Sequence, residues 1–207
     1  MKLLLAFVSF FILDPYQAFS IDFYPRESKT YLDGGSQPIS HITYEYNDSN
    51  LLIESKTISY GRTTFFTIEY NENKEKIRSN VLDENHNLIM FSLYETEYHQ
   101  DSILLYKEYV SHHSSGWVFR NSSEYEYTNF DKISLSKHYD ANGFLVSYVE
   151  YEYSNDQLLR ETNVYSAVDA VLLKNIYEND GEKLTRVNST SYVNARVHQK
   201  THTEYFY

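Results

Sequence analysis

The stretch Tyr151-Glu152-Tyr153-Ser154-Asn155 places two tyrosines one residue apart and follows them with polar residues. Residues i and i+2 of a β-strand lie on the same face of a sheet. Ser and Asn favour turns because their side chains hydrogen-bond to nearby backbone groups. The stretch therefore predicts the end of a strand. Similar stretches recur at Tyr44–Asp48, Ile68–Glu72, Tyr125–Asn129 and Ile176–Asp180.

The repeat has the same order in most copies. A polar turn opens it, an apolar pair such as Leu158-Leu159 follows, and a mostly polar strand ends in a tyrosine or an aliphatic residue. Turns such as Asn142-Gly143 and Asp180-Gly181 are typical of hairpins. Such short connections make successive strands antiparallel neighbours. The predicted strand-ending residues are Tyr46, Tyr60, Tyr70, Leu82, Tyr98, Val110, Tyr127, Tyr139, Tyr153, Tyr165, Tyr177, Tyr192 and Tyr205.

These observations predict an all-β fold, an antiparallel meander of about 12–13 short strands. Twisted sheets of more than about ten strands tend to curl, split or close, so we expect a curled single sheet that forms a shell or a wide barrel. Strict alternation places Leu52, Glu54, Lys56, Ile58 and Tyr60 on one face. That face is predicted to be apolar at the strand ends and charged at the centre.

The N-terminus has the features of a signal peptide. Met1-Lys2 is followed by an apolar run from Leu3 to Leu13, and Ala18-Phe19-Ser20 supplies small residues for cleavage. The run is shorter than the roughly 20 residues of a membrane-spanning helix. We expect residues 1–20 to direct export, so that the mature chain is periplasmic, exposed at the cell surface or secreted.

The rest of the chain divides into two parts. Residues 21–41 contain Pro25, Pro38 and Gly34-Gly35 and lack the repeat, so we expect an extended lead-in or cap. Residues 42–207 are the expected tyrosine-rich repeat domain. No other apolar stretch approaches the length of a membrane span, and no transmembrane helix is expected in the mature chain.

Composition limits the possible partners. The chain has 207 residues, a formal net charge of -11, 22 tyrosines and no cysteine. Nucleic-acid-binding proteins need a basic surface, so a nucleic-acid partner is not expected. A chain without cysteine has neither disulfides nor a lipid-bearing cysteine after its signal peptide. Strand pairing and apolar burial must therefore stabilise the fold.

The run Tyr139-Asp140-Ala141-Asn142-Gly143-Phe144-Leu145 resembles a YD repeat, the tyrosine–aspartate unit of the Rhs family. The resemblance covers roughly residues 42 to 207 as a pattern. Most copies depart from it, because Tyr46 is followed by Asn and Tyr153 by Ser. The resemblance implies a spiralling β-sheet that forms a hollow shell and an exported protein. It implies no catalytic residues, because the family's repeats carry none.

No catalytic, cofactor or metal site is predicted. His112-His113 lacks a visible third ligand, and His198 and His202 are too far apart along a strand to share an ion. The paired acids Glu150 and Glu152 are best explained as a solvated charged face. No Gly-x-Ser-x-Gly turn and no phosphate-binding glycine loop occurs.

Rows of tyrosine are the one functional feature that the sequence offers. Exposed rings present an apolar face and a hydroxyl group, which suit a glycan or an envelope protein as partner. The competing interpretation is that the rows pair across strands and hold the sheet together. The candidate ligand-binding residues are Tyr127, Tyr139, Tyr153, Tyr165 and Tyr177.

The leading hypothesis is an exported, non-enzymatic β-repeat protein that binds or scaffolds at the cell envelope or surface. One alternative is an outer-membrane β-barrel, since the chain ends in Tyr205-Phe206-Tyr207, although charges such as Lys56 and Glu161 interrupt an apolar band. A second alternative is a glycan-active hydrolase, which requires two carboxylates in one pocket.

Overall fold

The computed structural model describes residues 24–99, 102–112, 117–129, 132–155 and 157–207, with the backbone alone for residues 98–120 within these ranges. The described residues form fourteen β-strands. Their bounds are β1 (Glu27–Leu32), β2 (Ser40–Tyr46), β3 (Leu52–Ser59), β4 (Arg62–Tyr70), β5 (Lys76–Leu82), β6 (Leu88–His99), β7 (Ser102–His112), β8 (Trp117–Tyr127), β9 (Ile133–Tyr139), β10 (Leu145–Tyr153), β11 (Leu159–Ser166), β12 (Val171–Asp180), β13 (Lys183–Val193) and β14 (Arg196–Phe206).

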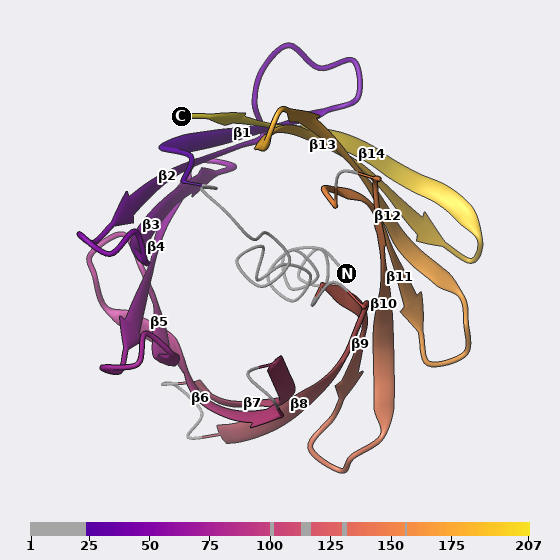
Figure 1. Cartoon of the computed structure of the whole chain (residues 1–207). Helices are drawn as coiled ribbons and strands as arrows, with labels where there is room; N and C mark the ends of the chain where they lie inside the picture. Colours follow the sequence, from indigo (N-terminus) through magenta and orange to yellow (C-terminus); the bar gives the residue numbers. More distant parts are fainter. Residues whose placement is uncertain (1–23, 100–101, 113–116, 130–131, 156) are drawn as a thin grey trace.

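The strands form one closed ring (Figure 1). Each strand pairs antiparallel with its neighbours in the chain, and β1 pairs with both β2 and β14. The predicted all-β antiparallel meander is confirmed. The thirteen predicted strand-ending residues correspond to β2 through β14. The additional strand, β1, lies within the segment 21–41, and the predicted signal peptide lies outside the described residues.

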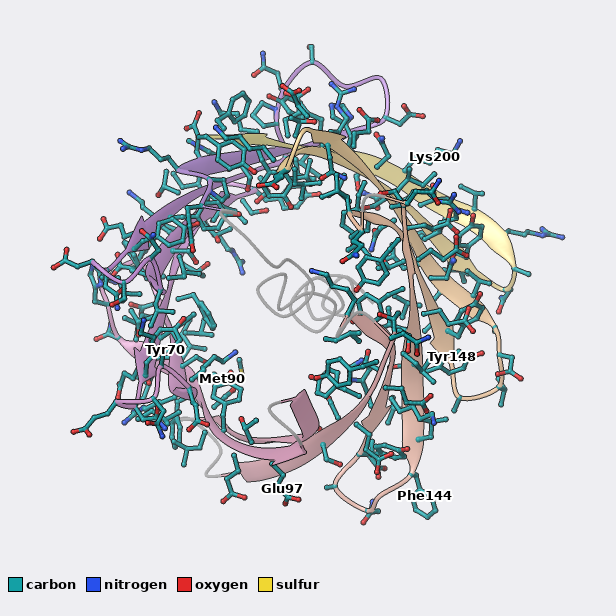
Figure 2. The ribbon with its side chains drawn as sticks, in the orientation of Figure 1. Tyr70, Met90, Glu97, Phe144, Tyr148 and Lys200 are labelled. Atoms are coloured by element: carbon teal, nitrogen blue, oxygen red, sulfur yellow. The ribbon has the colours of Figure 1, made fainter. Side chains whose placement is uncertain are left out.

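The ring has two chemically different faces. Figure 2 shows Met90 pointing to the inside of the ring, whereas Glu97, Tyr148 and Lys200 point outward. The strand register extends these two faces around the whole ring. Buried residues gather on the inner face, where Leu159, Tyr177, Leu184 and Val187 form a cluster. Charged side chains gather on the outer face. None of the described residues belongs to a helix that is able to span a membrane.

A five-residue turn recurs because its first side chain organises the backbone. Asp140 Oδ1 accepts hydrogen bonds from the N–H groups of Asn142 and Phe144, both at 2.9 Å. Gly143 has a φ of 80°, a conformation that glycine adopts without steric cost. Equivalent turns begin at Asn47, Asn71, Asp83, Ser154 and Ser166.

A β-bulge after the turn changes the predicted face assignment. Tyr153 pairs with Leu159 while Glu152 pairs with Glu161, so Arg160 is an extra residue. A bulge shifts the alternation by one residue. Leu159 consequently lies on the inner face and Glu161 on the outer face. The same shift follows Leu52, Ile133 and Leu184. The prediction that strand-end leucines share a face with charged strand centres is therefore wrong.

Candidate functional site

Two positions recur at the strand ends, as in Tyr151-Glu152-Tyr153. The tyrosine at the first of these positions points inward and bonds to a small polar residue. The Tyr177 hydroxyl lies 3.1 Å from Oγ1 of Thr162, which is buried on β11. Thr162 pairs directly with Asn175, so Tyr177 reaches it diagonally. Diagonal neighbours on one face are within reach of aromatic side chains. The same diagonal pair occurs in Ser28–Tyr44, Ser79–Tyr94 and Ser136–Tyr151.

The second tyrosine of the pattern bonds to backbone. The Tyr153 hydroxyl donates to the carbonyl oxygen of Ile133, the first residue of β9, at 2.8 Å. This contact satisfies a carbonyl next to a bulge, where the regular ladder is interrupted. The same kind of side-chain bond to a backbone carbonyl occurs in Tyr46–Pro25, Tyr70–Leu52 and Tyr207–Leu184. In Asn179–Leu159 an asparagine takes the place of the tyrosine. The inward tyrosines thus join adjacent strands.

The five candidate tyrosines do not lie in one row. Tyr127, Tyr153 and Tyr177 belong to the inner face, whereas Tyr139 and Tyr165 belong to the outer face. Tyr177 is only 5% exposed. Burial raises the pKa of the Tyr153 and Tyr177 hydroxyls. The inner three therefore have surroundings suited to packing, and the outer two have surroundings suited to external contact.

Two outward tyrosines form a stacked pair. Tyr148 of β10 and Tyr165 of β11 are directly opposite in register, with ring centroids 4.8 Å apart and ring planes 15° apart. Tyr139 lies on the same face of the adjacent strand β9. All three rings are half-buried, so part of each ring contacts solvent.

Carboxylates accept hydrogen bonds from two of these three hydroxyls. Tyr139 donates to Glu124 at 2.8 Å and Tyr148 donates to Asp169 at 2.9 Å. Burial and the nearby charge of Glu150 raise the pKa of the Tyr165 hydroxyl. The bond to Asp169 raises the pKa of Tyr148 to about 12 because it stabilises the protonated phenol. We call these three tyrosines and three acids (Glu124, Glu150 and Asp169) the outer tyrosine patch.

Exposed apolar residues border the outer tyrosine patch. Phe144 is 70% exposed, Val146 55% and Val168 83%. The N–H of Ala167 donates to the carbonyl of Val146 at 3.1 Å, so the β11–β12 connection lies beside the first residues of β10. Apolar side chains next to stacked rings form a surface suited to an amphipathic ligand.

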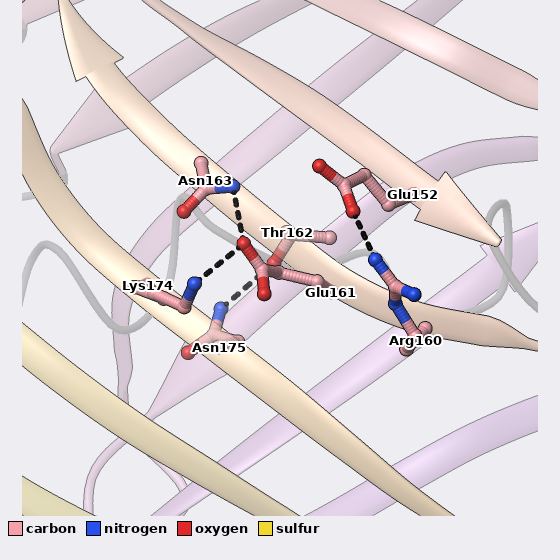
Figure 3. A network of polar contacts seen from close by, with 7 residues as sticks. All are labelled: Glu152, Arg160, Glu161, Thr162, Asn163, Lys174 and Asn175. Atoms are coloured by element: carbon pink, nitrogen blue, oxygen red, sulfur yellow. Dashed lines mark hydrogen bonds and ion pairs between the residues drawn. The ribbon is translucent and has the colours of Figure 1, made fainter. Parts of the chain in front are cut away.

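Ion pairs cover the neighbouring outer wall. Figure 3 shows Lys174 bound to Glu161 at 2.7 Å and Arg160 bound to Glu152 at 2.6 Å. The contact from Asn175 to Thr162, at 3.1 Å, joins the same strands on the inner face. Lys174 is the largest cause of the lowered pKa of Glu161. The wall thus separates a charged outer surface from a neutral hydroxyl-rich inner one at this position.

Sequence reasoning missed Tyr148, because it does not end a strand. A signal was available in the turn from Ser154 to Leu158, which joins β10 to β11. The turn begins at Ser154 and makes β10 and β11 adjacent, so aligning the two strands across it brings Tyr148 opposite Tyr165. Tyr148 is therefore found by pairing strands across their turns and not by comparing strand ends.

A shallow hollow of about 300 Å³ lies elsewhere, between β12, β13 and β14. Glu178, Arg186 and Glu204 are among its lining residues. Arg186 bonds to Glu204 at 2.7 Å, and Glu178 accepts a hydrogen bond from Asn188. Both acids are thus engaged by neighbouring side chains. Among the described side chains, no three potential ligands are placed to hold a metal ion.

Comparison with known proteins gives remote structural likenesses only. No protein-family model matches the chain, and no curated protein sequence matches it. A porin-like protein from Bacteroides uniformis is 13% identical with a TM-score of 0.48, covering 90% of this chain and 98% of its own. A DUF1329 family protein from Desulfovibrio piger is 10% identical with a TM-score of 0.33, covering 87% and 84%.

The Photorhabdus luminescens Tc holotoxin pore is 11% identical with a TM-score of 0.23, covering 79% of this chain and 11% of its own. Since all three TM-scores lie below 0.5, we base no conclusion on these likenesses. The YD-repeat resemblance stays a prediction from the sequence pattern.

Proposed function

We propose that the chain is an exported β-repeat protein that binds glycans at the cell envelope through the outer tyrosine patch. The stacked pair Tyr148–Tyr165, in which the Tyr148 hydroxyl bonds to Asp169, is the observation that carries this proposal. The N-terminal signal-peptide pattern supports export.

The chemistry of the patch suits a sugar. Tyrosine rings offer a flat apolar surface to one face of a pyranose, while carboxylate oxygens accept hydrogen bonds from its hydroxyl groups. Glu124 and Asp169 each bond to a tyrosine hydroxyl, which fixes the carboxylate beside its ring. Rings and acceptors held in place in advance reduce the entropy lost on binding.

The charged outer wall favours contact with water over contact with lipid. A lipid-facing wall needs an apolar band along its strands. The pairs Lys174–Glu161 and Lys137–Glu126 lie on the outer face within the strands rather than in the turns. We therefore favour a water-facing outer wall over the outer-membrane alternative. Purification without detergent tests this, and aggregation that only detergent prevents would favour the membrane alternative.

Isothermal titration calorimetry with linear hexasaccharides of glucose, N-acetylglucosamine and glucosamine tests the binding proposal. We expect at least one to bind, and Tyr148→Leu or Tyr165→Leu to weaken that binding about tenfold, equivalent to about 1.4 kcal/mol. Tyr31→Leu is the matched control, because Tyr31 is also an outward tyrosine in a ring stack, at 4.9 Å from His202 on a different part of the wall.

Two results would count against the proposal. One is that none of the three hexasaccharides binds. The other is that Tyr31→Leu weakens binding as much as Tyr148→Leu. The hydrolase alternative makes a separate prediction, that incubation shortens the oligosaccharides, and chromatography of the mixtures detects it.

A further inference from the structure

We propose that the outer tyrosine patch selects glycans with free amino groups and disfavours anionic glycans. This inference rests on the proposed function and specifies the class of ligand. It follows from the charges around the three rings.

Acids outnumber bases at the patch. Glu124 and Asp169 accept hydrogen bonds from tyrosine hydroxyls, and the charge of Glu150 acts on Tyr165. Lys137 is directly opposite Tyr148 in register, but it bonds to Glu126 at 2.6 Å. The three acids of the patch and the Lys137–Glu126 pair together supply four carboxylates and one ammonium. The negative charge of a uronic acid or a sulfated sugar placed on the rings would be repelled by these carboxylates.

Hydrogen bonding favours an amine for a second reason. In each contact the tyrosine is the donor, so the carboxylate retains free acceptor positions beside the ring. An ammonium group has three donors and no acceptor, which matches such positions. A cation over the face of an aromatic ring gains further electrostatic attraction. An N-acetyl group removes the charge and two of these donors.

The patch keeps this character over a wide pH range. The bond to Asp169 raises the pKa of Tyr148, whereas burial, together with a nearby carboxylate, raises the pKa of Tyr139 and Tyr165. The three hydroxyls therefore stay protonated and remain donors. At mildly acidic pH the sugar amine is protonated, so the preference for an amino sugar is tested there.

The test compares hexasaccharides of glucosamine, N-acetylglucosamine and galacturonic acid by calorimetry at mildly acidic pH. We expect glucosamine to bind at least about tenfold more tightly than N-acetylglucosamine, and galacturonic acid to bind most weakly. Added salt should reduce the preference, because the groups are exposed and salt screens them.

Two double variants distinguish an effect of the patch on glycan preference from an effect of the chain's overall negative charge. Glu150→Gln with Asp169→Asn should abolish the preference for glucosamine. Glu72→Gln with Glu84→Gln changes net charge equally at two exposed turn residues and should leave the preference intact. Circular dichroism checks that both double variants fold.

The outcomes are distinct. Equal affinity for the amino and N-acetyl hexasaccharides, or a preference that survives in the Glu150/Asp169 variant, overturns this inference and leaves glycan binding in place. Absence of binding to all of these hexasaccharides overturns both this inference and the proposed function.

Discussion

The Tyr177 hydroxyl lies 3.1 Å from Oγ1 of Thr162, which is on the adjacent strand and fifteen residues earlier in the chain. Both residues are buried. The pair explains why tyrosine recurs near the strand ends. The tyrosine hydroxyl on one strand bonds to a small hydroxyl residue that lies diagonally across from it on the preceding strand. Inward tyrosines of this kind therefore stabilise the wall, whereas the outward tyrosines of the patch face a possible ligand.

Replacement of Tyr177 by phenylalanine tests the stabilising role. Thr162 Oγ1 keeps its contact with Asn175, so we expect Tyr177→Phe to lower the free energy of unfolding by about 1 kcal/mol. Chemical denaturation measures the change. Tyr60→Phe is the control, since Tyr60 is 79% exposed and should change stability by no more than a few tenths of a kcal/mol. Equal effects of the two changes would contradict the account.

The second inward tyrosine gives a related prediction. Tyr153→Phe leaves the Ile133 carbonyl without its side-chain donor, so we expect a loss of about 1 kcal/mol, or a melting temperature lower by about 2–4 °C. Tyr148→Phe removes a bond at the exposed surface and should lower the melting temperature less. Thermal unfolding followed by circular dichroism compares the two. A larger effect of Tyr148→Phe would show that the inner bond is not stabilising.

Part of this architecture was predictable from sequence and part was not. Strand ends and turns are local, so Tyr46, Tyr153 and their equivalents located thirteen strands correctly. The face of each residue was not predictable by alternation, because bulges such as the one at Arg160 shift it. Strand β1 carries no tyrosine repeat and is recognised through its pairing with β2 and β14.

The candidate site was likewise predictable from sequence only in part. Tyr139 and Tyr165 were identified from the pattern, but their separation from Tyr153 and Tyr177 depends on the strand register. Tyr148 required knowledge of pairing across a turn. The carboxylate partners come from other strands or turns, and no local pattern encodes them.

His138 predicts a loss of stability in acid. It lies on the inner face between Ser123 and Ser136, with Nδ1 2.8 Å from Ser123 Oγ, and burial lowers its pKa from 6.5 to about 4. The unfolded chain therefore binds a proton first as pH falls. Stability is complete above about pH 6.5 and decreases toward pH 4, by at most about 3 kcal/mol.

Denaturation curves measured between pH 7 and pH 4 test this. His138→Gln should remove most of the decrease above pH 4, whereas His86→Gln, at an exposed turn residue, should retain it. Parallel stability profiles for the wild type and His138→Gln would refute the assignment.

The two ion pairs of Figure 3 should differ in strength. The side chains of Lys174 and Glu161 are 35% and 18% exposed, whereas those of Arg160 and Glu152 are 61% and 50% exposed. Exposed pairs contribute little because water and salt screen them. We expect Lys174→Gln to cost about 1 kcal/mol at neutral pH and Arg160→Gln less than about 0.5 kcal/mol.

The pH dependence gives a check on this comparison. The lowered pKa of Glu161 means that its contribution is present above the ordinary glutamate pKa of 4.5 and is lost as pH falls below it. The difference between wild type and Lys174→Gln should therefore shrink in acid. Equal costs for the two substitutions at neutral pH would contradict the predicted difference in screening.

Hydroxyl-radical footprinting with mass spectrometry, with and without the glucosamine and N-acetylglucosamine hexasaccharides, tests the central claim most directly. The account predicts protection by a bound sugar at Tyr139, Tyr148 and Tyr165, with Tyr31 and Tyr60 unchanged. Tyr177, which is buried, should react slowly throughout. Protection confined to tyrosines outside the patch, or fast labelling of Tyr177 in the free protein, would contradict the division between inward structural tyrosines and an outward binding patch.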